Sequence, residues 1–199
     1  DLKISLRGFG ARSSFGIRGV RIFVDDIPET LPDGQAQVDS IDLGSTGRIE
    51  VLRGPASTLY GNAAGGVIAV FSELGETDPY VEAAVAGGNY EYQRYQLKVA
   101  GTHRSLDYML SGSHTDLDGY REFSRTRAAS VNGKLGIQIT DRDELLIAVN
   151  HTDQPQAQDP GGIDAAQVSA DRRSARPLNV QFDAGEELSQ QRIGGIYRT

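Results

Sequence analysis

Side chains that could support catalysis or metal binding are few and scattered along this chain. The adjacent carboxylates Asp25 and Asp26 could hold a metal ion or exchange a proton, but neighbours on a strand point to opposite faces, so a turn is the better interpretation. His103, His114 and His151 lack the spacing of zinc ligands. No Ser-His-Asp or Cys-His arrangement can be assembled, and the chain has no cysteine. We therefore predict that the protein is not an enzyme and binds no metal or cofactor.

Two glycine-rich stretches invite comparison with phosphate-binding loops. They comprise residues 8–10, which read Gly-Phe-Gly, and residues 61–66. Neither stretch matches the Gly-x-Gly-x-x-Gly pattern, and no Lys-Ser or Lys-Thr pair follows either of them. We predict that both form backbone turns, where glycine admits conformations that a side chain would block.

The elements that position these residues begin with short strands and turns. Strands are predicted at residues 2–6 and 20–24, with a turn at residues 25–28, and residues 38–43 form either a short helix or an irregular loop. The segment from Arg48 to Ser72 is more regular. In order, it is predicted to contain a strand, a Gly-Pro stop, a short helical turn, a double-glycine bend and a second strand, at residues 48–53, 54–55, 56–60, 65–66 and 67–71.

This segment resembles the end of the plug domain in TonB-dependent outer-membrane receptors. The family usually has glycine where Asp26 stands, and it often has an Asn-Ile-Ile-Thr run where residues 69–72 read Ala-Val-Phe-Ser. Several blocks in one fixed order make the resemblance far more specific than a single short motif. The matching blocks are Ile4-Ser-Leu-Arg-Gly-Phe-Gly10, Phe23-Val-Asp-Asp-Ile-Pro28, Arg48-Ile-Glu-Val-Leu-Arg-Gly-Pro55, Leu59-Tyr-Gly61 and Gly65-Gly-Val-Ile68.

From about residue 79 onward, apolar residues alternate with small or polar ones, which is the period of half-exposed β-strands. Leu135, Ile137, Leu145 and Ile147 are expected on one face of an antiparallel sheet. The strands are predicted near residues 79–88, 91–101, 106–115, 130–140, 144–152 and 187–199.

The predicted connections between these strands alternate in length. Residues 102–105 and 141–143 form tight turns, whereas the connections at 119–129 and from 153 to about 185 are much longer. Short turns at one end and long loops at the other are typical of outer-membrane barrels, and a long structureless loop is uncommon in a compact soluble domain. The resemblance implies a barrel of roughly 22 strands around a plug, most of which lies outside this chain.

These patterns predict the fold class and its two parts. We expect an α+β plug fragment over residues 1–76, followed over residues 77–199 by antiparallel all-β strands of an incomplete transmembrane β-barrel. No run of about 18 apolar residues occurs, so no membrane-spanning helix is expected. The chain begins without Met, and both of its ends fall inside strand-like patterns. We therefore expect an internal piece of a longer secreted precursor.

Two sets of arginines are candidate functional residues. Arg7 and Arg53 each precede a glycine in a matching block. The resemblance implies that arginines there pair with barrel-wall carboxylates and latch the plug, a role suited to the bidentate guanidinium; the alternative is solvated strand arginines. Arg172, Arg173 and Arg176 form a basic cluster in the long outer loop. They would attract an anionic metal chelate, unless they are simply solvated.

The resemblance implies energy-coupled import of a scarce, bulky nutrient across the Gram-negative outer membrane, most often a ferric siderophore or similar iron chelate. The implied partners are that ligand, the membrane lipid and TonB, which would contact a segment upstream of Asp1. Nucleic acid is not expected, because the net charge is −7 and no basic stripe exists. Two alternatives are a passive porin or adhesin-like barrel, which has no reason to carry plug blocks, and a soluble β domain of an enzyme, which would need convergent catalytic side chains.

Overall fold

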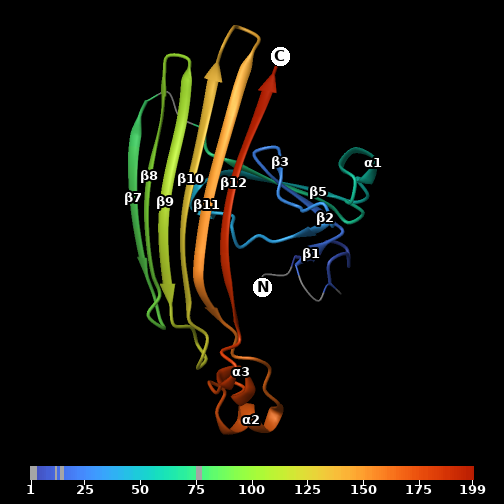
Figure 1. Ribbon diagram of the computed structural model, residues 1–199, viewed down its shortest axis with the longest axis vertical. Helices are drawn as coiled ribbons and strands as arrows, with labels where there is room; N and C mark the ends of the chain where they lie inside the picture. The colour runs from blue at the N-terminus through green and yellow to red at the C-terminus, as the bar shows by residue number, and fades with distance from the viewer. Residues whose placement is uncertain (1–3, 12, 14–15, 75–77) are drawn as a thin grey trace.

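The computed structural model describes residues 4–11, 13, 16–74 and 78–199 and contains two main sheets (Figure 1). The small sheet has the strand order β3-β2-β6-β5, and the long sheet has the order β12-β11-β10-β9-β8-β7. A short pair, β1 with β4, lies beside the small sheet. We call the chain that precedes the long sheet the first part. Its elements are β1 Ile17–Arg18, β2 Val20–Val24, β3 Ile27–Pro28, β4 Gln35–Ala36, the 3-10 helix η1 Leu43–Ser45, β5 Thr46–Arg53, α1 Ser57–Tyr60 and β6 Gly66–Ser72.

The small sheet contains both parallel and antiparallel strand pairs. Strand β2 runs parallel to β6, whereas β3 and β5 are antiparallel to their neighbours. Helix α1 connects β5 to β6 at the predicted place, and the small sheet is not continuous with the long sheet. The predicted strand at residues 2–6 is not seen over residues 4–6, where Leu6 makes only an isolated bridge to Phe9; residues 2 and 3 lie outside the described residues.

Close backbone packing explains the double-glycine bend before β6. Gly66 has a φ of +137°, and an ideal Cβ on it would lie 2.2 Å from the carbonyl oxygen of Leu52. An ideal Cβ on Gly65 would lie 2.6 Å from the Cβ of Phe9. Both distances are shorter than real Cβ contacts, so a side chain at either position would separate β5 or the N-terminal segment from β6.

The apolar core of the first part lies within the small sheet and the segments that pack on it. Ile17, Val20 and Ile22 are almost completely buried, and a second cluster forms around Ala63 and Val67. Burial of these side chains stabilises the sheet by about 25 cal/mol for each square ångström of apolar surface removed from water. The small sheet therefore has a core of its own.

The long sheet is antiparallel throughout, and its strands follow one another in sequence order. Leu135 lies opposite Ile147 and Ile137 opposite Leu145, which confirms the predicted shared face. The same face carries many exposed apolar side chains, including Val85, Leu97, Leu110, Val131 and Ile193. The strands are β7 Tyr80–Gly87, β8 Gln93–His103, β9 Leu106–Leu117, β10 Thr126–Gln138, β11 Glu144–Gln158 and β12 Gly185–Arg198.

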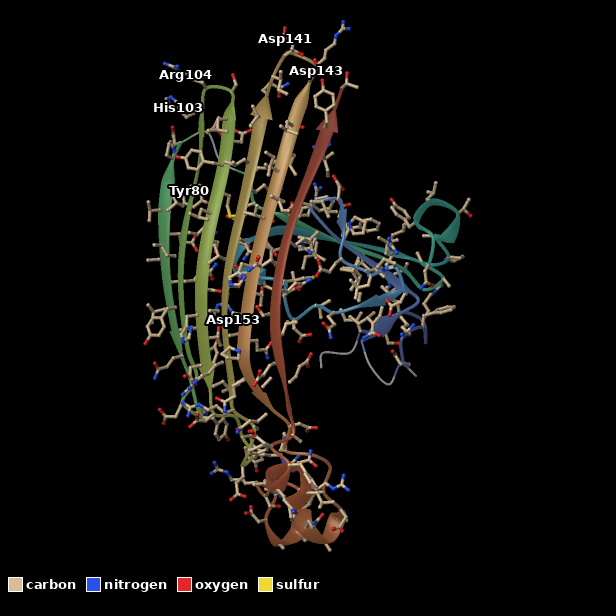
Figure 2. All side chains as sticks on the ribbon, in the orientation of Figure 1. Tyr80, His103, Arg104, Asp141, Asp143 and Asp153 are labelled. Carbon is tan, nitrogen blue, oxygen red and sulfur yellow. The ribbon has the colours of Figure 1, made fainter. Side chains whose placement is uncertain are left out.

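The connections of the long sheet are short at one end and long at the other. Figure 2 shows His103 and Arg104 at the same end as Asp141 and Asp143, where the short turns lie. The longest connection lies at the opposite end and contains α2 Ala165–Ala170 and α3 Pro177–Gln181. The expectation of a structureless loop there was wrong, because the sequence supplies helix starts: Asp164 and Gln167 form a capping box for α2, and proline begins α3.

No helix in the described part of the chain is long and apolar enough to cross a membrane. The last strand of the small sheet ends at Ser72 and the first strand of the long sheet begins at Tyr80. The predicted boundary between residues 76 and 77 falls within residues 75–77, which lie outside the described residues, so that boundary stays a prediction.

Candidate functional site

A polar row crosses strands β8 to β12 on the face of the long sheet that looks toward the small sheet. Its members oppose one another in the strand ladders, so the row runs directly across the sheet. Each member has a hydrogen bond or an ion pair with an atom of residues 29–73. The members of the polar row are Lys98, Ser111, Asn132, Asn150 and Arg192.

Asp42 lies at the centre of these contacts. It is the N-cap of η1, so its carboxylate is held beside the first turn of that helix. Its side chain is only 2% exposed, and its Oδ2 accepts hydrogen bonds from Ser111 Oγ and Asn132 Nδ2, both at 3.4 Å. Arg94, on β8, pairs with the Oδ1 of Asp42 at 2.7 Å. The cap geometry therefore directs one buried carboxylate toward three strands of the long sheet, β8, β9 and β10.

Asp25 makes the most enclosed ion pair between the two sheets. It forms the β2–β3 turn with Asp26, as predicted, and the φ angles of the two residues are +52° and +63°. Its Oδ1 lies 2.6 Å from Lys134 Nζ, and the two side chains are 3% and 5% exposed. Ser72, at the end of β6, donates its backbone N–H and its hydroxyl to the same carboxylate at 3.0 and 2.6 Å. Both oxygens of this buried acid are therefore hydrogen-bonded, as burial requires.

Glu29, just after β3, makes a similar set of contacts with β12. Its side chain is 3% exposed and is paired with Arg192. Its Oε1 accepts hydrogen bonds from Ser40 Oγ at 3.0 Å and from Gln190 Nε2 at 3.3 Å. The backbone carbonyl of Ser40 in turn accepts from Asn150 Nδ2 at 3.3 Å. Residues 29 and 40 thus attach the outer edge of the first part to β11 and β12.

Two further pairs lie nearer to solvent. Asp26 pairs with Arg198 at 2.6 Å, and Glu73 pairs with Lys98 at 2.8 Å. The hydroxyl of Tyr80 also donates to Glu73, at 2.8 Å. Burial alone would raise the pKa of Glu73, but hydrogen bonds from Lys98 and Tyr80 outweigh that effect and hold the pKa below its ordinary value.

Within the described residues, five ion pairs join the first part to the long sheet, and all five have the same polarity. The acid always belongs to the first part, and the base always belongs to the long sheet. We call the acids the plug carboxylates: Asp25, Asp26, Glu29, Asp42 and Glu73. We call the bases the wall cations: Arg94, Lys98, Lys134, Arg192 and Arg198.

The predicted latch residues are not part of this interface. Arg7 and Arg53 are exposed, and within the described residues neither side chain makes an ion pair. Arg53 ends β5, which runs away from the long sheet toward α1 (Figure 1). The guanidinium of Arg7 lies close by, since an ideal Cβ on Gly54 would be 3.7 Å from its Nη1. The structure brings the two arginines to one region, and their role as a latch stays a prediction.

Among the outer-loop arginines, Arg173 is engaged within the loop region itself. Its guanidinium carbon lies 5.8 Å from the ring centres of both Tyr90 and Tyr120, and its Nε donates to the Tyr120 carbonyl at 3.1 Å. Arg172 and Arg176 are exposed. All three remain predicted ligand contacts, and Arg173 has in addition a structural role that its charge alone did not indicate.

Arg121 joins the same outer connections but was not singled out from the sequence. Its guanidinium donates to the backbone carbonyls of Pro160, Gly161 and Ser174 at distances between 2.6 and 3.2 Å. One cation therefore holds both ends of the segment that contains α2. Nothing in the local sequence distinguishes this arginine from its neighbours, because its partners are backbone atoms distant in the chain.

A cavity of about 1160 Å³ lies between the segment around residues 35–39 and the α2–α3 end of the long sheet. Asp39, Asp159 and Glu186 are among its lining residues, and no lysine or arginine of the described chain lines it. The described residues contain no group of three or more side chains arranged to hold a metal ion. The cavity walls thus offer hydrogen-bonding groups and negative charge.

Comparison with known proteins agrees with this architecture. Residues 1–67 match the family described as TonB-dependent Receptor Plug Domain. The chain is 34% identical over 134 residues to a hemin receptor of Yersinia pestis, covering 66% of this chain and 19% of that protein. It is 32% identical over 156 residues to a pesticin receptor of Yersinia enterocolitica, covering 76% of this chain and 22% of that protein. The chain thus spans about a fifth of the length of these relatives.

Solved structures show the same fold. The unliganded ferric citrate transporter FecA aligns with a TM-score of 0.69 and 26% identity over 80% of this chain and 27% of that chain. The siderophore receptor PirA of Pseudomonas aeruginosa aligns with a TM-score of 0.57 and 23% identity over 76% of this chain and 29% of that chain. The chain belongs to the TonB-dependent outer-membrane receptors. These receptors are transporters of the Gram-negative outer membrane and not enzymes. Because residues 1–67 match the plug family, the small sheet and its neighbours are the plug of a TonB-dependent receptor, and the long sheet is part of its barrel wall.

The interface of this TonB-dependent receptor was only partly visible in its sequence. Alternation placed Lys98, Asn132 and Lys134 among the polar positions of their strands, which is the face that meets the plug. The carboxylates Asp25 and Asp26 were recognised as a turn but not as wall contacts. Asp42 and Glu29 carried no signal, because an acid in an irregular segment has no periodicity from which a direction can be predicted.

Proposed function

We propose that the receptor to which this chain belongs imports an iron chelate, such as a ferric siderophore or hemin, by an energy-coupled rearrangement of the plug. The observation that carries this proposal is the polar character of the plug–wall interface. The plug carboxylates and the polar row meet through hydrogen bonds and ion pairs, whereas the apolar plug core is enclosed within the plug itself. A plug held in this way can leave the wall without exposing its core.

Water can replace much of what the interface loses when the plug moves. Carboxylates, ammonium and guanidinium groups regain hydration when they separate, whereas separated apolar surfaces would incur the full hydrophobic cost. Two of the five ion pairs already include an acid that is more than a quarter exposed. A polar interface is therefore suited to a plug that must be held at rest and released under force.

The relatives support an iron-bearing cargo. They include receptors named for hemin, ferric citrate and siderophores. We propose that TonB supplies the energy through a segment outside this chain, and that the ligand first binds at the outer face, between the plug and the connections that contain α2 and α3. Arg172 and Arg176 are exposed in the α2–α3 region and would meet an anionic chelate on its approach.

We also propose that Arg7 and Arg53 latch the plug to a wall sector outside the long sheet. Their location supports this idea, because β5 places Arg53 away from the long sheet, whereas the plug carboxylates contact the long sheet. Two opposite sides of the plug would then be held by charge pairs of opposite polarity. Replacement of Arg53 by Ala should increase protease access to the plug, with little change in ligand binding at the outer face.

Growth under iron limitation tests the proposed function. Cells lacking their own receptors would carry the full-length protein and receive hemin, ferric citrate or one ferric siderophore as the only iron source. Growth on at least one chelate that disappears when TonB is deleted is the expected result. Growth that persists without TonB would indicate a passive porin, and growth on no chelate would contradict an iron-bearing cargo.

A further inference from the structure

We propose that the wall cations have a second role after the plug moves: they form an anion-binding track along the inner barrel wall, over which an oxyanion-bearing cargo passes. This inference rests on the proposed import function, because a track is needed only if the plug moves and a cargo follows. In the resting state the plug carboxylates occupy the track. In the open state the carboxylate or catecholate oxygens of the cargo would replace them.

The burial of these cations is the first observation behind the proposal. The side chains of Lys98 and Lys134 are each 5% exposed, and that of Arg192 is 18% exposed. Each of these side chains points from the long sheet toward the plug and ends at a plug carboxylate. Withdrawal of the plug would remove the cover of all three cations together with the plug carboxylate that pairs with each of them.

The wall itself neutralises only some of the wall cations. The Nζ of Lys98 lies 3.3 Å from the Oε2 of Glu82, and the Nη1 of Arg198 lies 3.1 Å from the Oε2 of Glu144. These two cations therefore keep a carboxylate partner on the wall. Among the described residues, the ion pairs of Arg94, Lys134 and Arg192 are with plug carboxylates alone. Withdrawal of the plug would therefore leave these three cations without the carboxylates that pair with them at rest.

The positions of these cations fit a path rather than a single binding site. Arg94 is on β8, Lys134 on β10 and Arg192 on β12, so the three cations are distributed across the width of the long sheet. The three cations also lie at different heights along the strands: Arg94 is on the long-connection side of the polar row, Arg192 is in it, and Lys134 is on its short-turn side. An anion could pass from one to the next without binding tightly to any of them, which conduction requires.

The same side chains recognise the plug and would recognise the cargo by the same chemistry. Guanidinium and ammonium groups that bind the carboxylates of Asp25 and Glu29 bind any oxyanion of similar geometry. The uniform polarity of the interface is thereby explained. Pairs of mixed polarity would hold this side of the plug equally well, but after the plug moves they would leave unpaired carboxylates on the long sheet, which repel an anionic cargo.

Ion selectivity of the opened full-length receptor tests this proposal without knowledge of the natural ligand. The receptor is placed in planar lipid bilayers, and urea is added to detach the plug, because urea competes with polar contacts while the closed barrel ladder is retained. The anion-to-cation permeability ratio is read from the reversal potential in a KCl gradient. Because the rest of the barrel also contributes charge, the informative quantity is the change between variants.

The key variant neutralises two pairs at once: Asp25→Asn with Lys134→Gln, and Glu29→Gln with Arg192→Gln. No buried charge is left unpaired, so the plug should still seat at rest. The permeability ratio of the opened channel is expected to fall by about twofold or more. The matched control carries Asp25→Asn and Glu29→Gln alone, which leaves the wall cations in place, and it should open more easily but keep the wild-type ratio. A second control, Arg142→Gln in an exposed turn, should also keep that ratio.

Two results would overturn the proposal. An unchanged ratio in the neutralised variant would show that these cations do not act on ions in the open channel. If urea opens no channel, the triple variant Asp25→Asn, Glu29→Gln and Asp42→Asn provides a second route to opening. Absence of conductance by both routes would mean that the wall cations are never uncovered. Because no iron uptake is measured, these results are independent of the test of the import function.

Discussion

The small sheet and the long sheet bury opposite kinds of surface. In the small sheet, Val20 and Ile22 are buried in one apolar cluster and Val67 in a second, so its apolar core lies inside the plug. In the long sheet, the buried inner positions include Lys98, Lys134 and Asn150, while large apolar side chains point outward and stay exposed. The first pattern is that of a water-soluble domain, and the second is that of a membrane barrel whose outer face meets lipid.

This difference separates the stability of the plug from its attachment. Apolar burial within the plug stabilises its fold, whereas ion pairs and hydrogen bonds determine whether it stays on the wall. Changes in the plug core, the interface and the outer wall should therefore have distinguishable consequences. The following predictions for the full-length receptor test that separation, from the largest expected effect to the smallest.

Replacement of Lys134 by Met should have the largest effect: it should weaken the attachment of the plug and leave the barrel unchanged. It leaves the buried carboxylate of Asp25 without its cation, which costs on the order of 3–5 kcal/mol. Limited proteolysis should then cut the plug much faster, while the barrel keeps its resistance to denaturation. The double variant Asp25→Asn with Lys134→Met should recover much of the protection. Equal protection of the single variant and the wild type would contradict an attachment made by buried charge.

Replacement of Leu97 by Arg should instead destabilise the barrel and leave the attachment of the plug unchanged. Leu97 is 54% exposed on the outer face, and a cation on the lipid side of a barrel costs about 2–4 kcal/mol near the membrane midplane. Unfolding of the barrel in lipid vesicles should shift by that amount, with plug protection at rest unchanged. The Leu97→Met control should be nearly neutral. A barrel of wild-type stability in the Arg variant would show that this face does not meet lipid.

Replacement of Arg121 by Met extends the comparison to the outer loops. There a cation is held by backbone carbonyls instead of carboxylates, and the lost charge-assisted bonds are worth about 1.5–3 kcal/mol. Amide hydrogen exchange over residues 159–176 should accelerate, whereas exchange in the plug should not change. Arg172→Met, at an exposed position, serves as the control. Unchanged exchange would mean that the helices α2 and α3 hold this region by themselves.

Acidification should weaken the Glu73 contact by a small amount. Its pKa is lowered in the folded state, so the stability it contributes is present above the ordinary value of 4.5 and is lost as the pH falls through the lower folded value. The contact is partly exposed, so the effect should be about 1 kcal/mol or less. Urea detachment of the plug at neutral and acidic pH measures it, and Glu73→Gln should lose this part of the pH dependence. An identical pH dependence in both proteins would show that Glu73 does not contribute to the attachment of the plug.

Local chemistry in the sequence was sufficient to predict most of the elements. Period-two alternation predicted every strand of the long sheet, and the glycine and proline positions predicted the turns around β5, α1 and β6. These signals are readable because a strand's faces and a turn's backbone angles depend on adjacent residues. The helices of the α2–α3 loop were missed because they have only six and five residues, too few for an apolar stripe that periodicity could detect.

The sequence also determined which face of each wall strand is polar, but only the tertiary structure decided where the plug sits on that face. Asn132 meets Asp42 across 90 positions of the chain, and Gln190 meets Glu29 across 161. Alternation assigns a residue to a face, but it contains no information on the register between strands or on the depth at which another domain docks. Those depend on how the plug core and the wall strands pack in space. The choice of Lys134 as the partner of Asp25, rather than another inward cation, follows from that packing alone.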